Sequence, residues 1–181
     1  MRGHEYTLYW EALSGAIAPQ AMLEEMGIAY NKIAVDMEKG EQRSLDYLAI
    51  NPTGQVPALK LPDGTVIGES AAMVLVLGEL HPKSGLVPEI GDPERPHFIR
   101  WLVFMAASVY MTFVRVNHPE RFIIDVTAIE SVRAAAIAEV NRHFAVLNSA
   151  IEGAPFFLRQ GFTALDIYIC MLTVWHPDLS D

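Results

Sequence analysis

The hydrophobic and polar positions of the first eighty residues change period several times. Runs rich in β-branched and aromatic side chains predict strands, and apolar residues three or four apart predict helices. Strands are predicted at residues 6–10, 28–36, 56–60 and 65–67, and helices at about 14–26, 41–50 (a short helix or a turn) and 69–80. Because a strand–helix–strand connection is right-handed and joins parallel strands, we expect the first two strands to be parallel. The pattern predicts a small α/β domain.

The pattern becomes helical after a proline-rich segment. Residues 82–93, "PKSGLVPEIGDP", contain three prolines and two glycines, which is typical of a linker. Two apolar stripes at helical spacing follow it. Their members are Phe98, Trp101, Leu102, Met105, Val109 and Phe113 in the first, and Ile129, Val132, Ile137, Val140, Phe144, Leu147 and Ile151 in the second. We therefore expect domains at residues 1–81 and 94–181, the second an all-α bundle.

A third helix of the bundle is predicted to begin at Thr163. A threonine is a good N-cap, and Asp166 stands three residues later, where its carboxylate can accept from the N-cap amide. The two residues form a capping box, which indicates a helix start in any protein.

Composition narrows the function classes. The formal net charge of −9 opposes a general nucleic-acid binder, which needs a basic face for phosphates. Cys170 is the single cysteine, which excludes a disulfide within the chain, and we expect it to be buried in the helical half. The N-terminus lacks the apolar core of a signal peptide, and the longest apolar run, 101–114, is too short to span a bilayer. We expect a soluble cytoplasmic protein without a membrane partner.

The stretch "NPTGQVPALKLPDGTVIGES", residues 51–70, carries polar and proline positions inside its most strand-like region. Pro57 lacks a backbone donor at the start of a predicted strand, and Glu69 and Ser70 stand where a strand becomes a helix. Each has a purely structural interpretation. Pro57 suits an edge strand, the Glu69 carboxylate suits a helix dipole, and Ser70 suits an N-cap.

Taken together, these motifs resemble a known family. "NPTGQVPAL", "DGTVIGES" and the following helix are similar to the glutathione-binding half of glutathione transferases, and "FTALDIYIC" resembles the capping-box segment of their helical domain. The resemblance covers essentially the whole chain, in order. It implies a thioredoxin-like N-terminal domain followed by a helical glutathione-transferase C-terminal domain, usually as a homodimer.

The resemblance assigns glutathione contacts to five residues. Pro57 would follow a cis peptide bond, which leaves the N–H and C=O of Val56 to pair with the cysteinyl backbone of glutathione. Ser70 and its amide would bind the γ-glutamyl carboxylate at a helix N-terminus, and Glu69 would hold the ammonium group. Gln42 matches a position that contacts the glycyl carboxylate in some classes.

The thiol-activating group is expected just after the first strand. Ser14 matches the serine of theta- and zeta-like classes, and its hydroxyl could donate to the thiolate. A plain N-cap role for Ser14 is the alternative. Tyr9 lies in the strand itself and is expected to pack. Gly15 occupies the position where beta-like bacterial members carry cysteine, so a cysteine mechanism is not expected.

The family binds its electrophile between the two domains. The matching positions are Trp10 and Leu13 in the first loop and Met105, Ser108 and Tyr110 in the first long helix of the second domain. Apolar and methionine side chains suit an adaptable pocket. Tyr110 stands where beta-like members often carry histidine, and packing or a dimer contact is the alternative role for its ring.

The predicted activity is transfer of the glutathione thiolate to a small hydrophobic electrophile, as in detoxification, with glutathione as co-substrate and no metal. Two alternatives remain, glutathione-dependent disulfide reduction and a non-catalytic binding or regulatory protein. Family members usually continue for some tens of residues beyond "ALDIYICMLTVW". Either the given chain lacks part of the helical domain or the electrophile pocket is unusually open.

Overall fold

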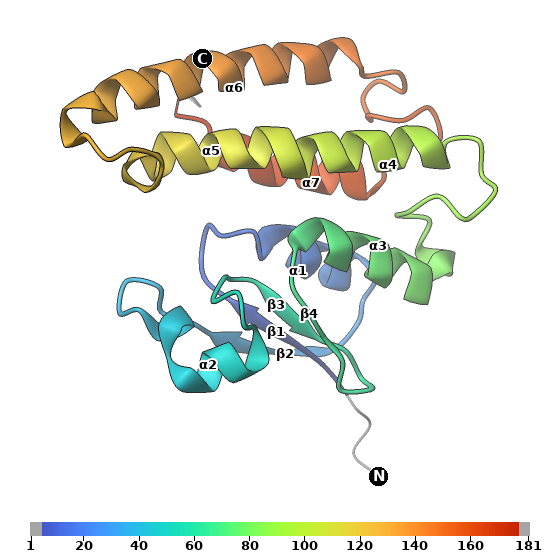
Figure 1. The fold of residues 1–181 in the computed structure, drawn as a ribbon. Coiled ribbons are helices and arrows are strands. Elements are labelled where there is room, and N and C mark those ends of the chain that lie inside the picture. Colours follow the sequence, from blue (N-terminus) through green and yellow to red (C-terminus); the bar gives the residue numbers. More distant parts are fainter. Residues whose placement is uncertain (1–4, 178–181) are drawn as a thin grey trace. The chain divides into compact units, whose positions relative to one another are not determined.

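The computed structural model describes residues 5–177 of the chain (Figure 1). Internal contacts divide the chain into two units, with the division between Ile90 and Gly91. This division falls inside the segment 82–93 that the sequence predicts as a linker. The segment is partly structured, because Pro82–Ser84 forms a 3₁₀ turn (η2) and both Leu86 and Val87 are buried.

The first unit contains a four-stranded mixed sheet. Its strands are β1 (Tyr6–Trp10), β2 (Tyr30–Ala34), β3 (Ala58–Lys60) and β4 (Val66–Ile67), in the spatial order β2-β1-β3-β4. Strands β1 and β2 are parallel, as predicted, because α1 makes the crossover between them. Strands β3 and β4 are antiparallel to their neighbours. The sheet is thus that of a thioredoxin-like domain.

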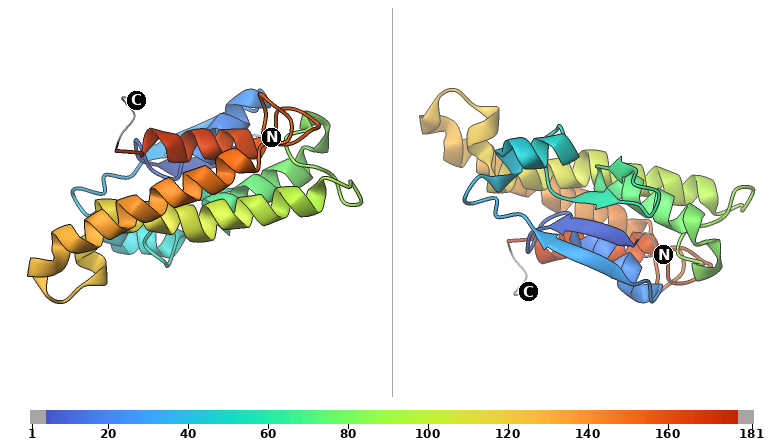
Figure 2. Two further views of the ribbon diagram at one scale, coloured as in Figure 1. Left: turned by 90° about the horizontal axis from the view of Figure 1, so that it is seen from above. Right: turned by 90° about the horizontal axis from the view of Figure 1, so that it is seen from below.

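Helices cover both faces of this sheet (Figures 1 and 2). Helices α1 and α3 lie together on one face and α2 lies on the other. Successive side chains of a strand point to opposite faces, and Tyr9 of β1 accordingly meets Tyr47 of α2 edge-on, at 6.1 Å between ring centroids. The helical segments of this unit are α1 (Ile17–Glu25), η1 (Glu41–Arg43), α2 (Leu45–Ile50) and α3 (Ser70–Leu80).

The second unit is helical, and no strand is assigned in its described part, residues 91–177. Helix α6 runs alongside α5 (Figures 1 and 2). Every residue of the first predicted stripe is buried. In the second stripe Val140 and Leu147 are buried, whereas Ile151 follows the end of α6 and is 42% exposed. The helical segments are α4 (Arg95–Phe104), η3 (Met105–Val109), α5 (Tyr110–Asn117), η4 (Pro119–Phe122), η5 (Val126–Ala128), α6 (Ile129–Ser149) and α7 (Ala164–Val174).

Helices α4 and α5 are joined through η3, a single π-helical turn, into one helical stretch, Arg95–Asn117. By length and composition alone this stretch could cross a membrane, with a mean hydropathy of 1.4 over an 18-residue window. Within the unit it packs against α6 and α7. These contacts are typical of the core helix of a bundle, and such helices can be as long and as apolar as a membrane span.

Helix α7 begins as predicted and corrects one expectation. Thr163 is its N-cap and Asp166 accepts from the Thr163 amide at 2.8 Å, so the capping box is confirmed. Cys170, which the sequence analysis expected to be buried, is exposed. The buried stripe of α7 includes Tyr168, Met171 and Leu172, and the 3.6-residue period turns Cys170 away from it.

Candidate functional site

The segment before β3 presents a free backbone edge. The Val56–Pro57 peptide bond is cis, as the resemblance implied. Within residues 5–177, neither the N–H nor the C=O of Val56 has a hydrogen-bond partner. Strand β3 begins only at Ala58 rather than at the predicted residue 56. A peptide lying along this edge could therefore pair with both groups of Val56.

The β3–β4 register relates this edge to the start of α3. Leu59 pairs with Ile67 and Lys60 with Val66. Val56 and Pro57 directly precede β3, and Glu69 and Ser70 follow β4 after Gly68, so both segments leave the same end of this antiparallel pair. The four residues predicted to bind two parts of one peptide thus lie at one end of the same strand pair.

Glu69 is the N-cap residue of α3 and has an unusual backbone. Its φ of 61° and ψ of 106° lie in a region that side-chain-bearing residues rarely adopt. Such strain costs about 1–3 kcal/mol and is concentrated at functional sites. The Glu69 side chain makes no cap hydrogen bond and is exposed, whereas Ser70 is buried. The first-turn amides of this helix suit an anionic ligand group.

Two residues without a predicted role, Tyr47 and Asn51, hold the segment before Val56. The Tyr47 hydroxyl and the Asn51 side-chain amide both donate to the carbonyl of Gln55, at 2.7 Å and 2.8 Å. Asn51 also accepts from the amide and hydroxyl of Thr53. A polar side chain at a buried position of α2 was the available signal for Tyr47, since a core helix normally carries an apolar residue there.

Gln42 lies in η1, close to the turn that contains Gly54. Gly54 has a φ of 61°, and a Cβ on it would stand 3.0 Å from both the Gln42 carbonyl and the Arg43 guanidinium, so this position favours glycine. The Gln42 side-chain nitrogen donates to Met37 O at 3.4 Å, and its Oε1 is buried without a partner in the described structure. Only the nitrogen could serve a carboxylate, which needs a donor.

Ser14 lies in the turn between β1 and α1 and is buried. Its Oγ donates to the Glu11 carbonyl at 2.7 Å and accepts from the Ala16 amide at 3.2 Å. The predicted helix start at residue 14 is corrected, because α1 begins at Ile17. The hydroxyl has one proton. Donation to a thiolate therefore requires Ser14 to release the Glu11 carbonyl.

The two predicted electrophile contacts of the first unit differ in exposure. Leu13 is 68% exposed and has a φ of 55°, so its apolar side chain is presented to solvent by an unusual backbone. Trp10 is half-buried at the end of β1, and Lys32 Nζ lies 3.6 Å from its ring centroid. This cation–π contact fixes the indole on β2.

Of the three predicted contacts of the second unit, Met105 and Ser108 lie in the π-helical turn η3 and Tyr110 directly follows it. Met105 is fully buried, whereas Ser108 and Tyr110 are partly exposed. Tyr110 meets Trp175 edge-on at 4.9 Å. The indole nitrogen of Trp175 is buried without a hydrogen-bond partner in the described structure. π-helical turns are frequent at functional sites.

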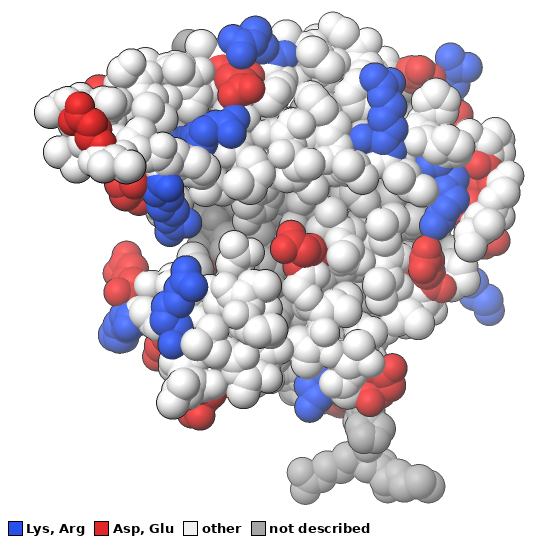
Figure 3. All heavy atoms as spheres, in the orientation of Figure 1, with Lys and Arg blue, Asp and Glu red and all other residues white. Residues whose placement is uncertain are grey.

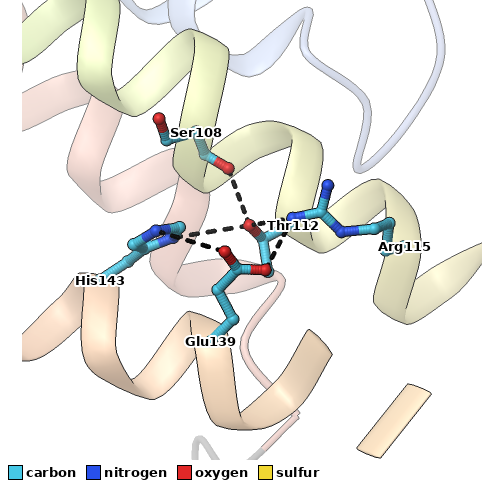
Figure 4. Close-up of polar contacts among 5 residues, drawn as sticks. All are labelled: Ser108, Thr112, Arg115, Glu139 and His143. Carbon is cyan, nitrogen blue, oxygen red and sulfur yellow. Dashed lines mark hydrogen bonds and ion pairs between the residues drawn. The ribbon is translucent and has the colours of Figure 1, made fainter. Parts of the chain in front are cut away.

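A polar cluster joins α5 to α6 within the second unit (Figure 4). Thr112 Oγ1 donates to the Ser108 carbonyl at 2.8 Å and accepts from Arg115, which also bonds Glu139 at 2.7 Å. Because Thr112 has a single proton, His143 Nδ1 must donate to Oγ1 across 3.5 Å. The pKa of His143 lies below its usual 6.5, because the effect of burial exceeds the opposing effect of the nearby Glu139 carboxylate.

Other features of the surface do not coincide with these residues. A cavity of about 510 Å³ lies at the C-terminal ends of α1 and α3 and contains none of the predicted contacts. On the face shown in Figure 3, Lys and Arg side chains are scattered among Asp and Glu. The described residues contain no group of three or more His, Cys, Asp or Glu side chains that could hold a metal ion.

Comparison with known proteins gives relatives over most of the chain. A family model of the glutathione S-transferase N-terminal domain matches residues 19–80. The uncharacterised GST-like protein YncG of Escherichia coli K12 is 32% identical over 164 residues, which are 90% of this chain and 78% of YncG. The disulfide-bond oxidoreductase YfcG of the same strain is 27% identical over 171 residues, 91% of this chain and 71% of YfcG.

Solved structures agree with these matches. A glutathione transferase homologue from Sulfitobacter, crystallised with bound glutathione, superposes with a TM-score of 0.87 at 28% identity. The superposition covers 95% of this chain and 82% of that one. The predicted fold, a thioredoxin-like domain followed by a helical domain, is therefore confirmed. The motifs, the fold and the relationship to YncG lead to one conclusion: the chain belongs to the glutathione S-transferase family.

Proposed function

We propose that this protein binds glutathione and transfers its thiolate to a small hydrophobic electrophile. One observation carries the proposal. The unpaired backbone groups of Val56 and the strained Glu69–Ser70 start of α3 lie at the same end of the antiparallel β3–β4 pair. This pairing suits an extended peptide with a charged head, because the edge binds backbone and the helix start binds a carboxylate. Gln42 is the proposed contact of the glycyl end.

The chemistry begins with loss of the glutathione thiol proton to solvent. The Ser14 hydroxyl then donates a hydrogen bond to the thiolate, which stabilises the anion and lowers the pKa of the bound thiol. The sulfur forms a bond to an electrophilic carbon, and either a leaving group departs with its electron pair or a conjugated system accepts the electrons and a proton. Binding both reactants in one place supplies much of the rate increase.

The proposed electrophile contacts come from both units. Trp10 and Leu13, with Met105, Ser108 and Tyr110, are the proposed electrophile contacts. Leu13 offers the most exposed apolar side chain of the five. We propose a homodimeric, cytoplasmic protein with a role in detoxification, without nucleic-acid or membrane partners.

Calorimetric titration with glutathione, followed by conjugation of chlorodinitrobenzene, tests the proposal. Glu69→Gln keeps the size of the side chain but removes the charge opposite the ligand ammonium. A charged hydrogen bond of about 1.5–3 kcal/mol corresponds to a roughly 10- to 100-fold weaker glutathione affinity. Absence of binding by the wild-type protein at millimolar glutathione would refute the proposal and favour a non-catalytic role.

Disulfide reduction is the second candidate activity, because the relative YfcG bears that name. In this reaction two glutathione thiols become glutathione disulfide, and the substrate disulfide takes up the two electrons and two protons. The only cysteine, Cys170, lies in the second unit, so glutathione itself would supply the reactive sulfur. Faster turnover of hydroxyethyl disulfide than of chlorodinitrobenzene would favour this activity.

A further inference from the structure

Tyr47 is a buried tyrosine whose hydroxyl makes one well-defined contact. The residue is 5% exposed, and its Oη donates to the Gln55 carbonyl at 2.7 Å. The ring is held edge-on by Tyr9, and the Tyr47 amide is capped by Ser44. Burial raises the pKa of Tyr47 to about 12, so the hydroxyl remains a donor at neutral pH.

Asn51 makes a second contact with the same carbonyl. Its side-chain amide donates to Gln55 O at 2.8 Å, and the residue is 6% exposed. Thr53 fixes the other end of the amide through its N–H and its hydroxyl. Both acceptor sites of the Gln55 carbonyl oxygen are therefore occupied by buried, held donors.

The Gln55 carbonyl belongs to the same peptide unit as the Val56 N–H. This peptide bond is not among the cis bonds of the described chain. In a planar trans unit the C=O and N–H point in opposite directions. Donors that hold the carbonyl therefore also fix the direction of the Val56 N–H. Hydrogen bonds to a carbonyl also polarise the peptide group, which makes its N–H a better donor.

We propose that Tyr47 and Asn51 are positioning residues that aim the Val56 amide at the cysteinyl carbonyl of glutathione. This inference rests on the proposed function. Neither side chain needs to touch the ligand, because each acts through the peptide unit between Gln55 and Val56.

Tyr47→Phe tests the inference with little change in packing, since the ring that meets Tyr9 is retained. Loss of one neutral hydrogen bond corresponds to a roughly 3- to 10-fold higher Kd for glutathione. The contact is made equally in the ground and transition states, so KM for glutathione should rise while kcat at saturating glutathione is unchanged. The Val56 amide resonance should also shift in the free variant, a readout that does not depend on activity.

Tyr30→Phe is the matched control. The Tyr30 hydroxyl also makes a short hydrogen bond, to Glu24 at 2.6 Å, but in β2 and away from Gln55 in sequence. The Tyr30→Phe variant should leave the glutathione Kd and the Val56 amide resonance unchanged. A thermal melt of each variant verifies folding, and Asn51→Asp, which retains the acceptor for Thr53, provides a second removal of a donor to Gln55.

The outcomes separate the two proposals. If wild type binds glutathione and Tyr47→Phe binds it equally well with an unshifted Val56 amide, the positioning role is wrong and the proposed function stands. A loss of kcat with unchanged KM would also overturn the positioning role. If wild type does not bind glutathione, the proposed function fails and this inference fails with it.

Discussion

Ser14→Ala should raise the pKa of enzyme-bound glutathione by a modest amount. In the structure the Ser14 hydroxyl donates to the Glu11 carbonyl, and thiolate stabilisation would need the same proton. The variant removes only the Oγ atom. The free protein also loses the acceptor for the Ala16 amide, which caps the turn before α1.

The magnitude follows from the exchange of partners. Release of a neutral hydrogen bond costs about 1 kcal/mol net, and a hydrogen bond to a charged group contributes about 1.5–3 kcal/mol. The difference of about 0.5–2 kcal/mol corresponds to roughly 0.4–1.5 pKa units. Below the thiol pKa the rate follows the thiolate fraction, so kcat/KM for chlorodinitrobenzene should fall by about 2- to 30-fold.

Ultraviolet absorbance of the thiolate across pH measures the pKa of bound glutathione directly. Ser149→Ala is the control, because Ser149 donates to the Ala145 carbonyl at 2.9 Å near the end of α6. It loses a local serine hydrogen bond in a helix that carries none of the proposed glutathione contacts. Identical pH profiles for Ser14→Ala and wild type would show that Ser14 is only a structural cap.

Three further outcomes are expected. In urea denaturation, the free energy of unfolding of Glu69→Gly should exceed that of Glu69→Ala by about 1–2 kcal/mol, because only glycine adopts a φ of 61° without strain. Equal stabilities would contradict the strain. Gly78→Ala should destabilise the fold by about 1–3 kcal/mol despite better helix propensity, since its Cβ would lie within 2.4 Å of Val87. Val87→Ala added to it should restore part of the loss in chemical denaturation, and strict additivity would count against the clash. His143 has a lowered pKa in the fold, so the unfolded state binds the proton more readily and stability falls as pH drops through about 6.5. The stability advantage of wild type over His143→Gln should shrink between neutral and mildly acidic pH, and a constant difference would contradict the pKa shift.

Local signals predicted the fold most reliably. Tyr6–Trp10 is a strand with the predicted bounds, because its β-rich composition and its burial agree. The capping box at Thr163 was also predicted, since both partners lie within one helical turn. The motif at residues 51–70 led to the correct family because it combines turn, cis-proline and helix-start signals in one short segment.

Features that depend on neighbours distant in sequence were not predicted. The positive φ of Glu69 contradicts the preference of its residue type, and surrounding structure must impose it. The contacts of Tyr47 with Tyr9 and Gln55 exist only after α2 packs on the sheet. Cys170 was assigned to the interior from its residue type alone, whereas the helical phase of α7 decides its exposure.

Asn51 has a consequence for the thermodynamics of binding. Its side chain donates to the Gln55 carbonyl and accepts from Thr53, all within the segment before Val56. One buried amide therefore holds this part of the proposed site before any ligand arrives. A site built in advance loses little conformational entropy when it is filled. Most of the interaction energy at this segment should then be retained as glutathione affinity, instead of being consumed in ordering the loop.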